Sequence, residues 1–423
     1  MIDFLYFMLI IAAYISSFWL ILTDSKGGGK YRLSYHVILL AFLFFSLPAP
    51  LVYSGDIFEA GVFYKGFSFE VFSIYVLFAF SLNLAFILTI LFERSRNGLL
   101  FYVQDKRPLS LFFLLLFLTS VFIYFVELDN LPNYSFFVDD YRLAYEKKQQ
   151  LALGSGFLLS KFQIVLVPLA LYVSIYYLME TLTKSCSPWV FVCLLVSFLL
   201  VLFYGTVRLS RGGLIYCFIA ICLAYFFKRD KGIPVKFFLG ILVIFFLMFY
   251  LIAYDSPSFF EVMTRINDRI VMQHGFIYIQ LDLAKDIPFL NSFNAPVLFN
   301  ILSNDYINVS KEAYDLYYNK DHSGTTAGLA FAQMYFSFGP LAFFVWTFIM
   351  IIFFYIDGLF YRSARYSNSM TAFYFTFYAL YLIPILTNTY SFFSFSIFFS
   401  ISFWIIVIFL FLVLKPKIIR KGI

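Results

Sequence analysis

The chain has 423 residues, of which 62% are hydrophobic and 13% are charged. Soluble domains contain roughly 25% charged residues, so this composition excludes an ordinary soluble protein of two or three domains. The net charge of +6 would indicate acidic partners for a soluble protein, but in a membrane protein the side on which each charge lies matters more than the total. All four cysteines lie in or beside apolar segments without CxxC or Cys/His spacing, so neither a disulfide nor a metal site is expected.

Eleven apolar segments follow one another along the chain, each close to the length of a transmembrane helix. A hydrocarbon core about 30 Å thick takes roughly 20 helical residues, and a helix satisfies its own backbone hydrogen bonds in lipid. We therefore predict an all-α polytopic membrane protein in which residues 1–423 form a single membrane domain. The predicted spans are 3–23, 36–53, 71–92, 109–127, 158–179, 188–207, 212–227, 237–254, 329–356, 370–388 and 395–414.

The basic residues gather in every second loop between these spans. That set of loops holds 18 of the 30 basic residues and only six acidic ones, whereas the opposite side holds 12 basic and 18 acidic residues. Because cytoplasmic loops are enriched in lysine and arginine, the pattern predicts an N-terminus outside and a C-terminus in the cytoplasm. The 18 residues are Lys26, Lys30, Arg32, Arg94, Arg96, Lys106, Arg107, Lys184, Lys228, Arg229, Lys231, Lys236, Arg362, Arg365, Lys415, Lys417, Arg420 and Lys421.

Two of the predicted outer loops are long, at 128–157 and 255–328. The second has 74 residues and mixes aromatic with charged side chains, as in Ile277–Leu281 and Tyr314–Tyr318. Loops longer than about 15 residues are usually functional or disordered, and this one is too aromatic for disorder. We therefore expect a large, ordered extracytoplasmic loop between the eighth and ninth helices. The sequence contains no nucleotide-binding loop, so any chemistry is expected outside.

A tight outer turn within Tyr204–Leu214 contains Arg208 and Arg211. The planar guanidinium group stays charged and can bond a diphosphate with two donors. Gly212 and Gly213 would let the backbone approach such a ligand where the next helix begins. Alternatively, both arginines reach outer-leaflet phosphates and only anchor the helix ends. We favour ligand binding, because basic residues are otherwise depleted from the short outer turns.

Arg265 and Arg269 are four residues apart in the large loop, so a helix would place them on one face. Apolar residues recur around them, which predicts a helix lying along the membrane surface. Such a helix could hold two cations over a lipid headgroup. The alternative of equal standing is an ordinary interfacial helix whose arginines pair with Glu261 or Asp268.

The outer loops contain further polar candidates. In the smaller loop Arg142 follows Asp139 and Asp140, two acids that could act as a base or bind a cation, although a solvated loop or helix cap is the simpler explanation. His274 and His322 are the histidines of the outer side. An unperturbed histidine has a pKa of about 6.5, which suits a general base or a headgroup contact, although an ordinary surface histidine is the simpler alternative for each.

The chain resembles the Wzy-type oligosaccharide repeat-unit polymerases, which are relatives of the O-antigen ligases. The resemblance rests on the number of helices, on the two outer loops and on three short motifs. These motifs are the arginine turn Ser210–Leu214, the segment His322–Leu329, and Tyr335–Pro340, where the large loop leads back into the membrane. Members of that family also carry an arginine followed at a set spacing by a glycine in both outer loops.

Here Arg142 precedes Gly154 by twelve residues and Arg265 precedes Gly275 by ten. The resemblance implies that a growing glycan is transferred from undecaprenyl diphosphate onto a new lipid-linked repeat unit, on the outer face of a bacterial cytoplasmic membrane, to build O-antigen or capsule. The expected catalytic residues are Arg208, Arg211, Arg265, Arg269 and His274, and the expected substrate-binding residues are Arg142, Asp139, Asp140, Tyr278 and His322.

The same resemblance sets the expected partners. They are the lipid-linked oligosaccharide, membrane lipid and a chain-length regulator, and no cofactor, metal or nucleic acid is expected. An O-antigen ligase would share the chemistry but use a different acceptor. A lipid-linked glycan flippase or another transporter would form no bonds, and it is disfavoured because most charges lie at predicted helix ends rather than inside the bundle.

Overall fold

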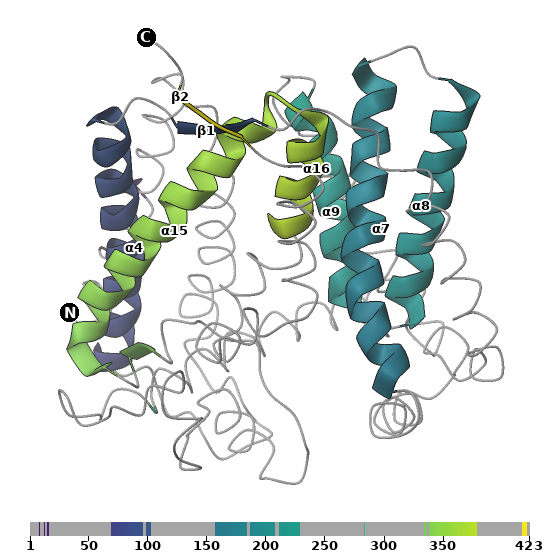
Figure 1. The fold of residues 1–423 in the computed structure, drawn as a ribbon. Coiled ribbons are helices and arrows are strands. Elements are labelled where there is room, and N and C mark those ends of the chain that lie inside the picture. The colour runs from purple at the N-terminus through teal and green to yellow at the C-terminus, as the bar shows by residue number, and fades with distance from the viewer. Residues whose placement is uncertain are drawn as a thin grey trace, which may run out of the picture.

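The computed structural model of the chain describes six α-helices, one short 3-10 helix and two strands (Figure 1). The described residues are 8, 12, 15–16, 69–95, 99–102, 157–183, 187–207, 211–228, 283, 334–335, 338–378 and 417–420. Its elements are α4 (Phe69–Ser95), β1 (Leu99–Tyr102), α7 (Phe157–Thr183), α8 (Pro188–Val207), α9 (Arg211–Lys228), η2 (Gly339–Leu341), α15 (Ala342–Ala364), α16 (Asn368–Phe377) and β2 (Lys417–Arg420).

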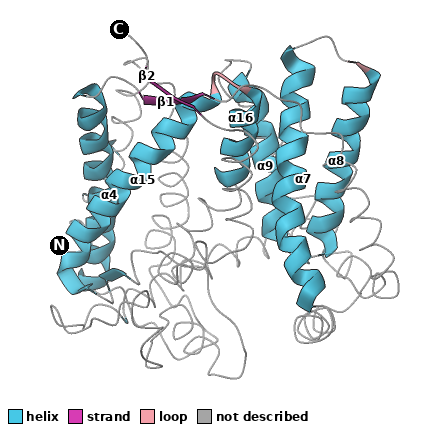
Figure 2. Ribbon diagram, in the orientation of Figure 1, coloured by secondary structure: helices cyan, strands magenta, loops and turns pink. Residues whose placement is uncertain are grey.

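This described part is almost entirely helical, which confirms that aspect of the predicted fold class (Figure 2). Four predicted spans coincide with α4, α7, α8 and α9 to within four residues at each end. The helix α8 begins at Pro188, where a missing N–H costs nothing, and the Ser187 carbonyl accepts a hydrogen bond from the Val190 N–H at 3.0 Å. The predicted spans 36–53, 109–127, 237–254 and 395–414, and both long loops apart from Phe157 and Leu283, lie outside the described residues.

The observed helix α15 extends beyond the end of the ninth predicted span, 329–356. The prediction ended it at residue 356 and placed 357–369 in a loop, whereas α15 continues to Ala364 and a three-residue turn leads to α16. The preceding turn η2 is fixed by Gly339, whose positive φ of 56° suits glycine, and by Pro340 at its second position, where a proline is tolerated in the first turn of a helix. The predicted end of the span at residue 356 therefore lies eight residues before the end of the observed helix.

Helix α16 begins earlier than predicted, at Asn368 instead of residue 370. Ser367 caps it, because its side-chain oxygen accepts a hydrogen bond from the Met370 N–H at 3.2 Å. Such a cap satisfies one of the four N–H groups that a helix start leaves unpaired. The turn is therefore compact, and α15 and α16 lie against each other.

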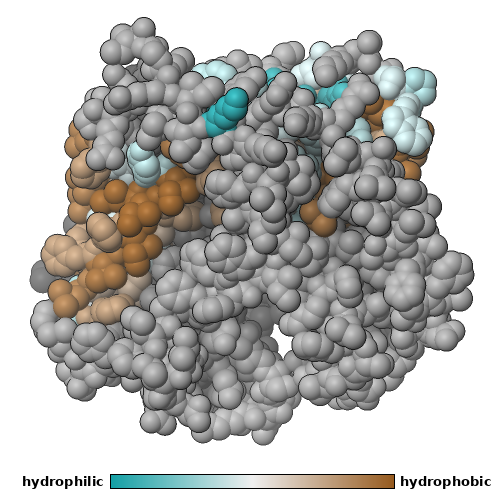
Figure 3. Space-filling view, in the orientation of Figure 1, coloured by the Kyte–Doolittle hydropathy of each residue, from teal (hydrophilic) through white to brown (hydrophobic). Residues whose placement is uncertain are grey.

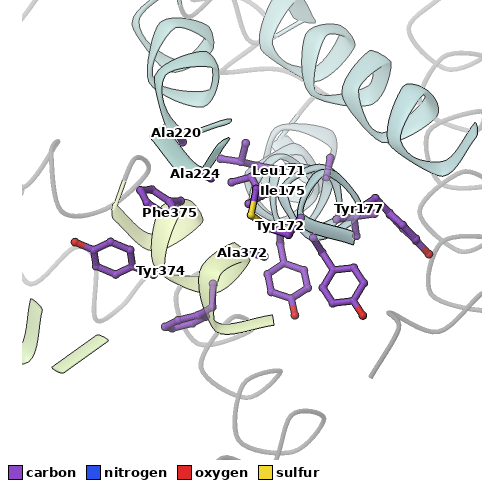
Figure 4. Packing of buried hydrophobic residues seen from close by; sticks show 14 of the residues in the cluster. Leu171, Tyr172, Ile175, Tyr177, Ala220, Ala224, Ala372, Tyr374 and Phe375 are labelled. Carbon is purple, nitrogen blue, oxygen red and sulfur yellow. The ribbon is translucent and has the colours of Figure 1, made fainter. Parts of the chain in front are cut away.

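The helices pack in two groups, with α4 against α15 and with α7 against α8, α9 and α16. In the second group, Leu171 and Ile175 of α7 lie beside Ala220 and Ala224 of α9 and near α16 (Figure 4). Small side chains let helix backbones approach closely, which is how helices associate where no water drives them together. In the first group Trp346 of α15 contacts Phe78 of α4, with ring centroids 5.6 Å apart.

The strands β1 and β2 form an antiparallel ladder in which Leu99 pairs with Arg420 and Tyr102 with Lys417. The ladder lies at one edge of the described helices, close to the end of α15 and the start of α16 (Figure 1). The ends of α4, α7 and α9 lie at the same edge (Figure 1). The sequence assigns all of these chain segments to a single side.

Among the described residues, one helix is both long and apolar enough to cross a membrane, the 26-residue segment Gly339–Ala364. Its exposed side chains include Phe344, Phe348, Ile352 and Ile356, which are four residues apart and so share one helix face. Figure 3 shows hydrophobic surface over this part of the molecule. The segment is about 38 Å long at 1.5 Å per residue, so in a bilayer of about 30 Å it would have to tilt.

Candidate functional site

Among the residues predicted for the site, the structure describes Arg211 alone. It is the first residue of α9. The helix α8 ends at Val207, so only residues 208–210 separate the two helices. The predicted site residues Arg208, Arg265, Arg269, His274, Arg142, Asp139, Asp140, Tyr278 and His322 lie outside the described residues. The structure therefore describes one member of the predicted set and no contact between its members.

The position of Arg211 follows from the packing of the opposite end of α9. There Phe227 contacts Tyr361 near the end of α15 and Phe375 of α16, with ring centroids 5.0 and 5.4 Å apart. Arg211 lies 16 residues before Phe227, which is about 24 Å along a helix. Arg211 and the β1–β2 ladder are therefore at opposite ends of the described helices.

A buried polar pair between α15 and α16 was not predicted from the sequence. The Tyr374 hydroxyl donates a hydrogen bond to Asp357 Oδ1 at 2.9 Å, and the two residues are 1% and 2% exposed. An ionisable residue inside an apolar helix is costly and is usually functional or paired. The signal was present in the sequence, because Asp357 lies in a long apolar segment, but the residue was assigned to a cytoplasmic loop.

Aromatic side chains connect this pair to the exposed residue Arg365. The guanidinium of Arg365 lies 5.3 Å from the ring centroid of Tyr361, and its Nη2 donates a weak hydrogen bond to the Tyr361 hydroxyl at 3.5 Å. The Tyr361 ring meets the Tyr374 ring edge to face at 5.9 Å. Cation–π and edge-to-face contacts of this kind add to the packing energy. The contacts of Tyr374 with Tyr361 and Asp357 therefore hold α16 against α15.

A second group of buried polar side chains lies near the C-terminal end of α7. Glu180 is 2% exposed, and Tyr177 lies close to Cys193 of α8 in the same buried cluster. The Asn368 amide of α16 donates to the Thr183 hydroxyl at 3.4 Å. These contacts connect three helices, and they have the character of packing contacts between helices rather than of a substrate site.

Neither buried group has the composition of a metal centre. Within the part of the chain that the structure describes, no three histidine, cysteine, aspartate or glutamate side chains are grouped as metal ligands. Chemically, the Asp357–Tyr374 pair offers one carboxyl group and one phenol, which suits a fixed contact between helices or the binding of a proton. The turn at Arg211 carries an arginine at a helix N-terminus, which suits an anion.

Comparison with known proteins finds no relative of this chain. No protein-family model, curated protein or solved structure matches this chain. The function is therefore argued from the residues of this chain and from the helix arrangement described above.

Proposed function

We propose that this protein is a membrane glycosyltransferase that polymerises undecaprenyl-diphosphate-linked oligosaccharide repeat units and releases undecaprenyl diphosphate. The reaction takes place on the outer face of a bacterial cytoplasmic membrane. The proposal includes eleven membrane spans, an outer N-terminus and a cytoplasmic C-terminus. It also includes a large ordered outer loop at 255–328 that contributes Arg265, Arg269 and His274 to the site.

The observation that carries the proposal is the location of the arginine turn. Arg211 begins α9 at the end of the helices opposite the β1–β2 ladder. Gly339, to which the large loop leads, starts the η2–α15 segment, whose far end lies near the same ladder. Arg211 and Gly339 are therefore at the same end of the described helices, and Gly339 follows the predicted large loop in the sequence, which supports a site shared between the arginine turn and that loop.

The proposed transfer depends on positively charged groups that stabilise the departing diphosphate rather than on a cofactor. As the sugar–phosphate bond breaks, negative charge develops on the departing diphosphate, and arginines in a partly dehydrated site stabilise it. The attacking sugar hydroxyl must lose a proton, for which a positioned base such as His274 is suited. The positive end of the α9 dipole adds to the charge of Arg211.

A test of the orientation uses single cysteines in a variant without the four native ones. Cysteines placed in 128–157 or 255–328 are expected to react with an impermeant thiol reagent in intact cells, because these loops are proposed to face outward. Cysteines placed in 94–107 or 228–236 are expected to react only after the cells are opened. Labelling of 228–236 in intact cells would reverse the proposed orientation.

One observation favours a second candidate, a lipid-linked glycan flippase or other transporter. The argument against transport was that charges avoid the bundle interior, yet Asp357 and Glu180 are both 2% exposed. Buried carboxyl groups of this kind mark proton or ion pathways in many transporters. Both lie toward the ladder end, however, far from Arg211, and the described hydrogen bond of Asp357 joins α15 to α16. We therefore keep polymerisation as the main proposal, with an O-antigen ligase as the closest alternative in chemistry.

The proposed activity predicts the effect of removing the protein from its host. Deletion is expected to stop chain extension while single repeat units are still transferred, because ligation and transport remain intact. Glycan gels should show the ladder of chain lengths collapse to one repeat unit, and plasmid-borne protein should restore it. Loss of the single-repeat band as well would instead indicate a ligase or a flippase.

A further inference from the structure

Helix α8 buries one face against its neighbours and exposes an apolar surface on the other side. The buried residues include Val190, Cys193, Ser197 and Val201. The exposed large apolar side chains are Trp189, Phe191, Val192, Leu195, Leu199 and Leu202, and the helix carries no charged residue. An exposed apolar surface of this kind marks contact with a membrane or with another protein.

Exposed apolar side chains occur in the other packing group as well. On α15 they are Phe344, Phe348, Ile352 and Ile356, and Figure 3 shows the hydrophobic surface along this helix. On α4 they are Leu77, Phe80, Leu84, Ile87, Leu91 and Phe92. The exposed apolar surface is therefore not confined to one patch on one helix, because helices of both packing groups contribute to it.

The exposed faces of α8 and α15 both end in an aromatic residue that carries a polar group. Trp189, 61% exposed, is the second residue of α8, and Tyr366, 51% exposed, follows exposed Arg365 in the turn after α15. The start of α8 and the end of α15 both lie at the edge that holds the β1–β2 ladder (Figure 1). Tryptophan and tyrosine are enriched at membrane–water interfaces, because part of each ring is apolar and the rest forms hydrogen bonds.

We propose that Trp189 and Tyr366 lie at the headgroup level of the cytoplasmic leaflet, and that lipid acyl chains cover the exposed faces of α4, α8 and α15. The inference rests on the membrane location in the proposed function but not on glycan transfer. Leu199 lies ten residues after Trp189, which is about 15 Å along a helix and half of a hydrocarbon core about 30 Å thick. The proposal therefore places Leu199 near the middle of the bilayer.

A second copy of the chain is the less suitable partner for these faces. A two-fold interface uses one self-complementary patch, whereas the exposed apolar side chains lie on helices of both packing groups. A bilayer imposes one boundary on every helix that crosses it, and interfacial aromatic residues gather at that boundary. The positions of Trp189 and Tyr366 at one edge of the described helices agree with such a boundary.

The test measures the depth of individual tryptophans in the purified full-length protein, reconstituted in phosphatidylcholine vesicles. Part of the lipid carries bromine, which quenches tryptophan fluorescence, either near the headgroup or near the ends of the acyl chains. The contribution of Trp189 is the difference in fluorescence between the wild type and Trp189→Phe, so the buried Trp346 stays in place. Bromine near the headgroup should quench this contribution at least about two-fold more strongly than bromine near the chain ends, because interfacial aromatic rings lie at headgroup level.

Leu199→Trp in the Trp189→Phe background is the matched control, because both positions are exposed on α8. It should show the reverse preference, with stronger quenching by bromine near the chain ends. Tyr366→Trp and Ile352→Trp in the same background repeat the comparison on α15, with shallow quenching expected for the first and deep quenching for the second. All of these side chains are exposed, so the substitutions remove little packing inside the protein.

Equal quenching of Trp189 by the two lipids, or a Leu199→Trp profile like that of Trp189, would overturn the proposal. Protein that floats with the vesicles but is quenched at neither position would also overturn it, because protein rather than lipid would then cover α8. Protein that does not float with the vesicles would overturn the membrane location itself, and with it the proposed function. The two failures are therefore distinguishable, and the measurement requires no glycan.

Discussion

Replacing Tyr374 with phenylalanine is expected to destabilise the folded protein by about 1–2 kcal/mol, because the substitution removes the hydroxyl that donates to Asp357 at 2.9 Å. Hydrogen bonds between membrane helices average about 0.6 kcal/mol and reach about 1.7 kcal/mol. Bonds to a charged group are worth more, roughly 1.5–3 kcal/mol. The Tyr374 bond belongs at the upper end, since its acceptor is a buried carboxyl group. The measurement is the free energy of unfolding by denaturing detergent.

A double-mutant cycle separates this hydrogen bond from other effects of the substitution. In an Asp357→Asn background the acceptor is neutral, so Tyr374→Phe should cost less than it does in the wild type. Tyr177→Phe is the matched control in α7, because the neighbour of Tyr177 is the thiol of Cys193 rather than a carboxyl group, so this substitution should cost less than Tyr374→Phe. Equal costs for Tyr374→Phe in both backgrounds would show that the pair does not couple α15 to α16.

The same variants also discriminate between the two functional candidates. If Asp357 only holds helices together, Asp357→Asn with normal membrane expression should retain a wild-type glycan ladder. A transporter that moves protons or ions through this carboxyl group would lose its activity in the same variant. Normal expression together with complete loss of glycan export would therefore favour transport over polymerisation.

Much of the described fold could be predicted from local patterns. The helix α8 was predicted at its observed bounds of 188 and 207, because a proline marks its start and an unbroken apolar run fills its length. The predictions for α7 and α9 ended within four residues of the observed ends for the same reason. Long apolar runs carry enough information in their own residues to locate a helix.

The errors arose where contacts between distant residues decide the structure. Asp357 looks like a helix terminator in the sequence, yet it is stabilised inside α15 by Tyr374, seventeen residues away. The pairing of Leu99–Tyr102 with Lys417–Arg420 has no local signature, since each strand has only four residues. Such pairings depend on the packing of the whole bundle, which a single sequence does not reveal.

The candidate site was predicted from chemistry, and the structure describes one of its residues. Arg211 begins a helix at the end opposite the β1–β2 ladder. Its partners in the two outer loops remain predictions. Residues such as Arg265 and His274 were selected by residue type and spacing, and those criteria do not specify which side chains meet.

Arg211→Lys is therefore the substitution that best separates catalysis from anchoring. Lysine keeps the positive charge but lacks the planar fork that bonds a diphosphate with two donors. Losing one charge-assisted hydrogen bond costs roughly 1.5–3 kcal/mol, so transfer should slow by about ten- to a hundred-fold. Arg211→Ala should be at least as damaging, and Arg208→Lys should behave in the same way.

The matched control for this experiment is Arg365→Lys, an arginine at the opposite end of the helices whose described contacts are with aromatic rings. It should leave the length and amount of polymer unchanged at matched membrane expression. If Arg211 only anchored α9 to lipid phosphates, lysine would substitute for it almost freely, because a flexible ammonium group also reaches headgroups. Wild-type ladders from both Arg208→Lys and Arg211→Lys would therefore remove the reason for locating the diphosphate at this turn, and the search for its site would move to Arg265 and Arg269.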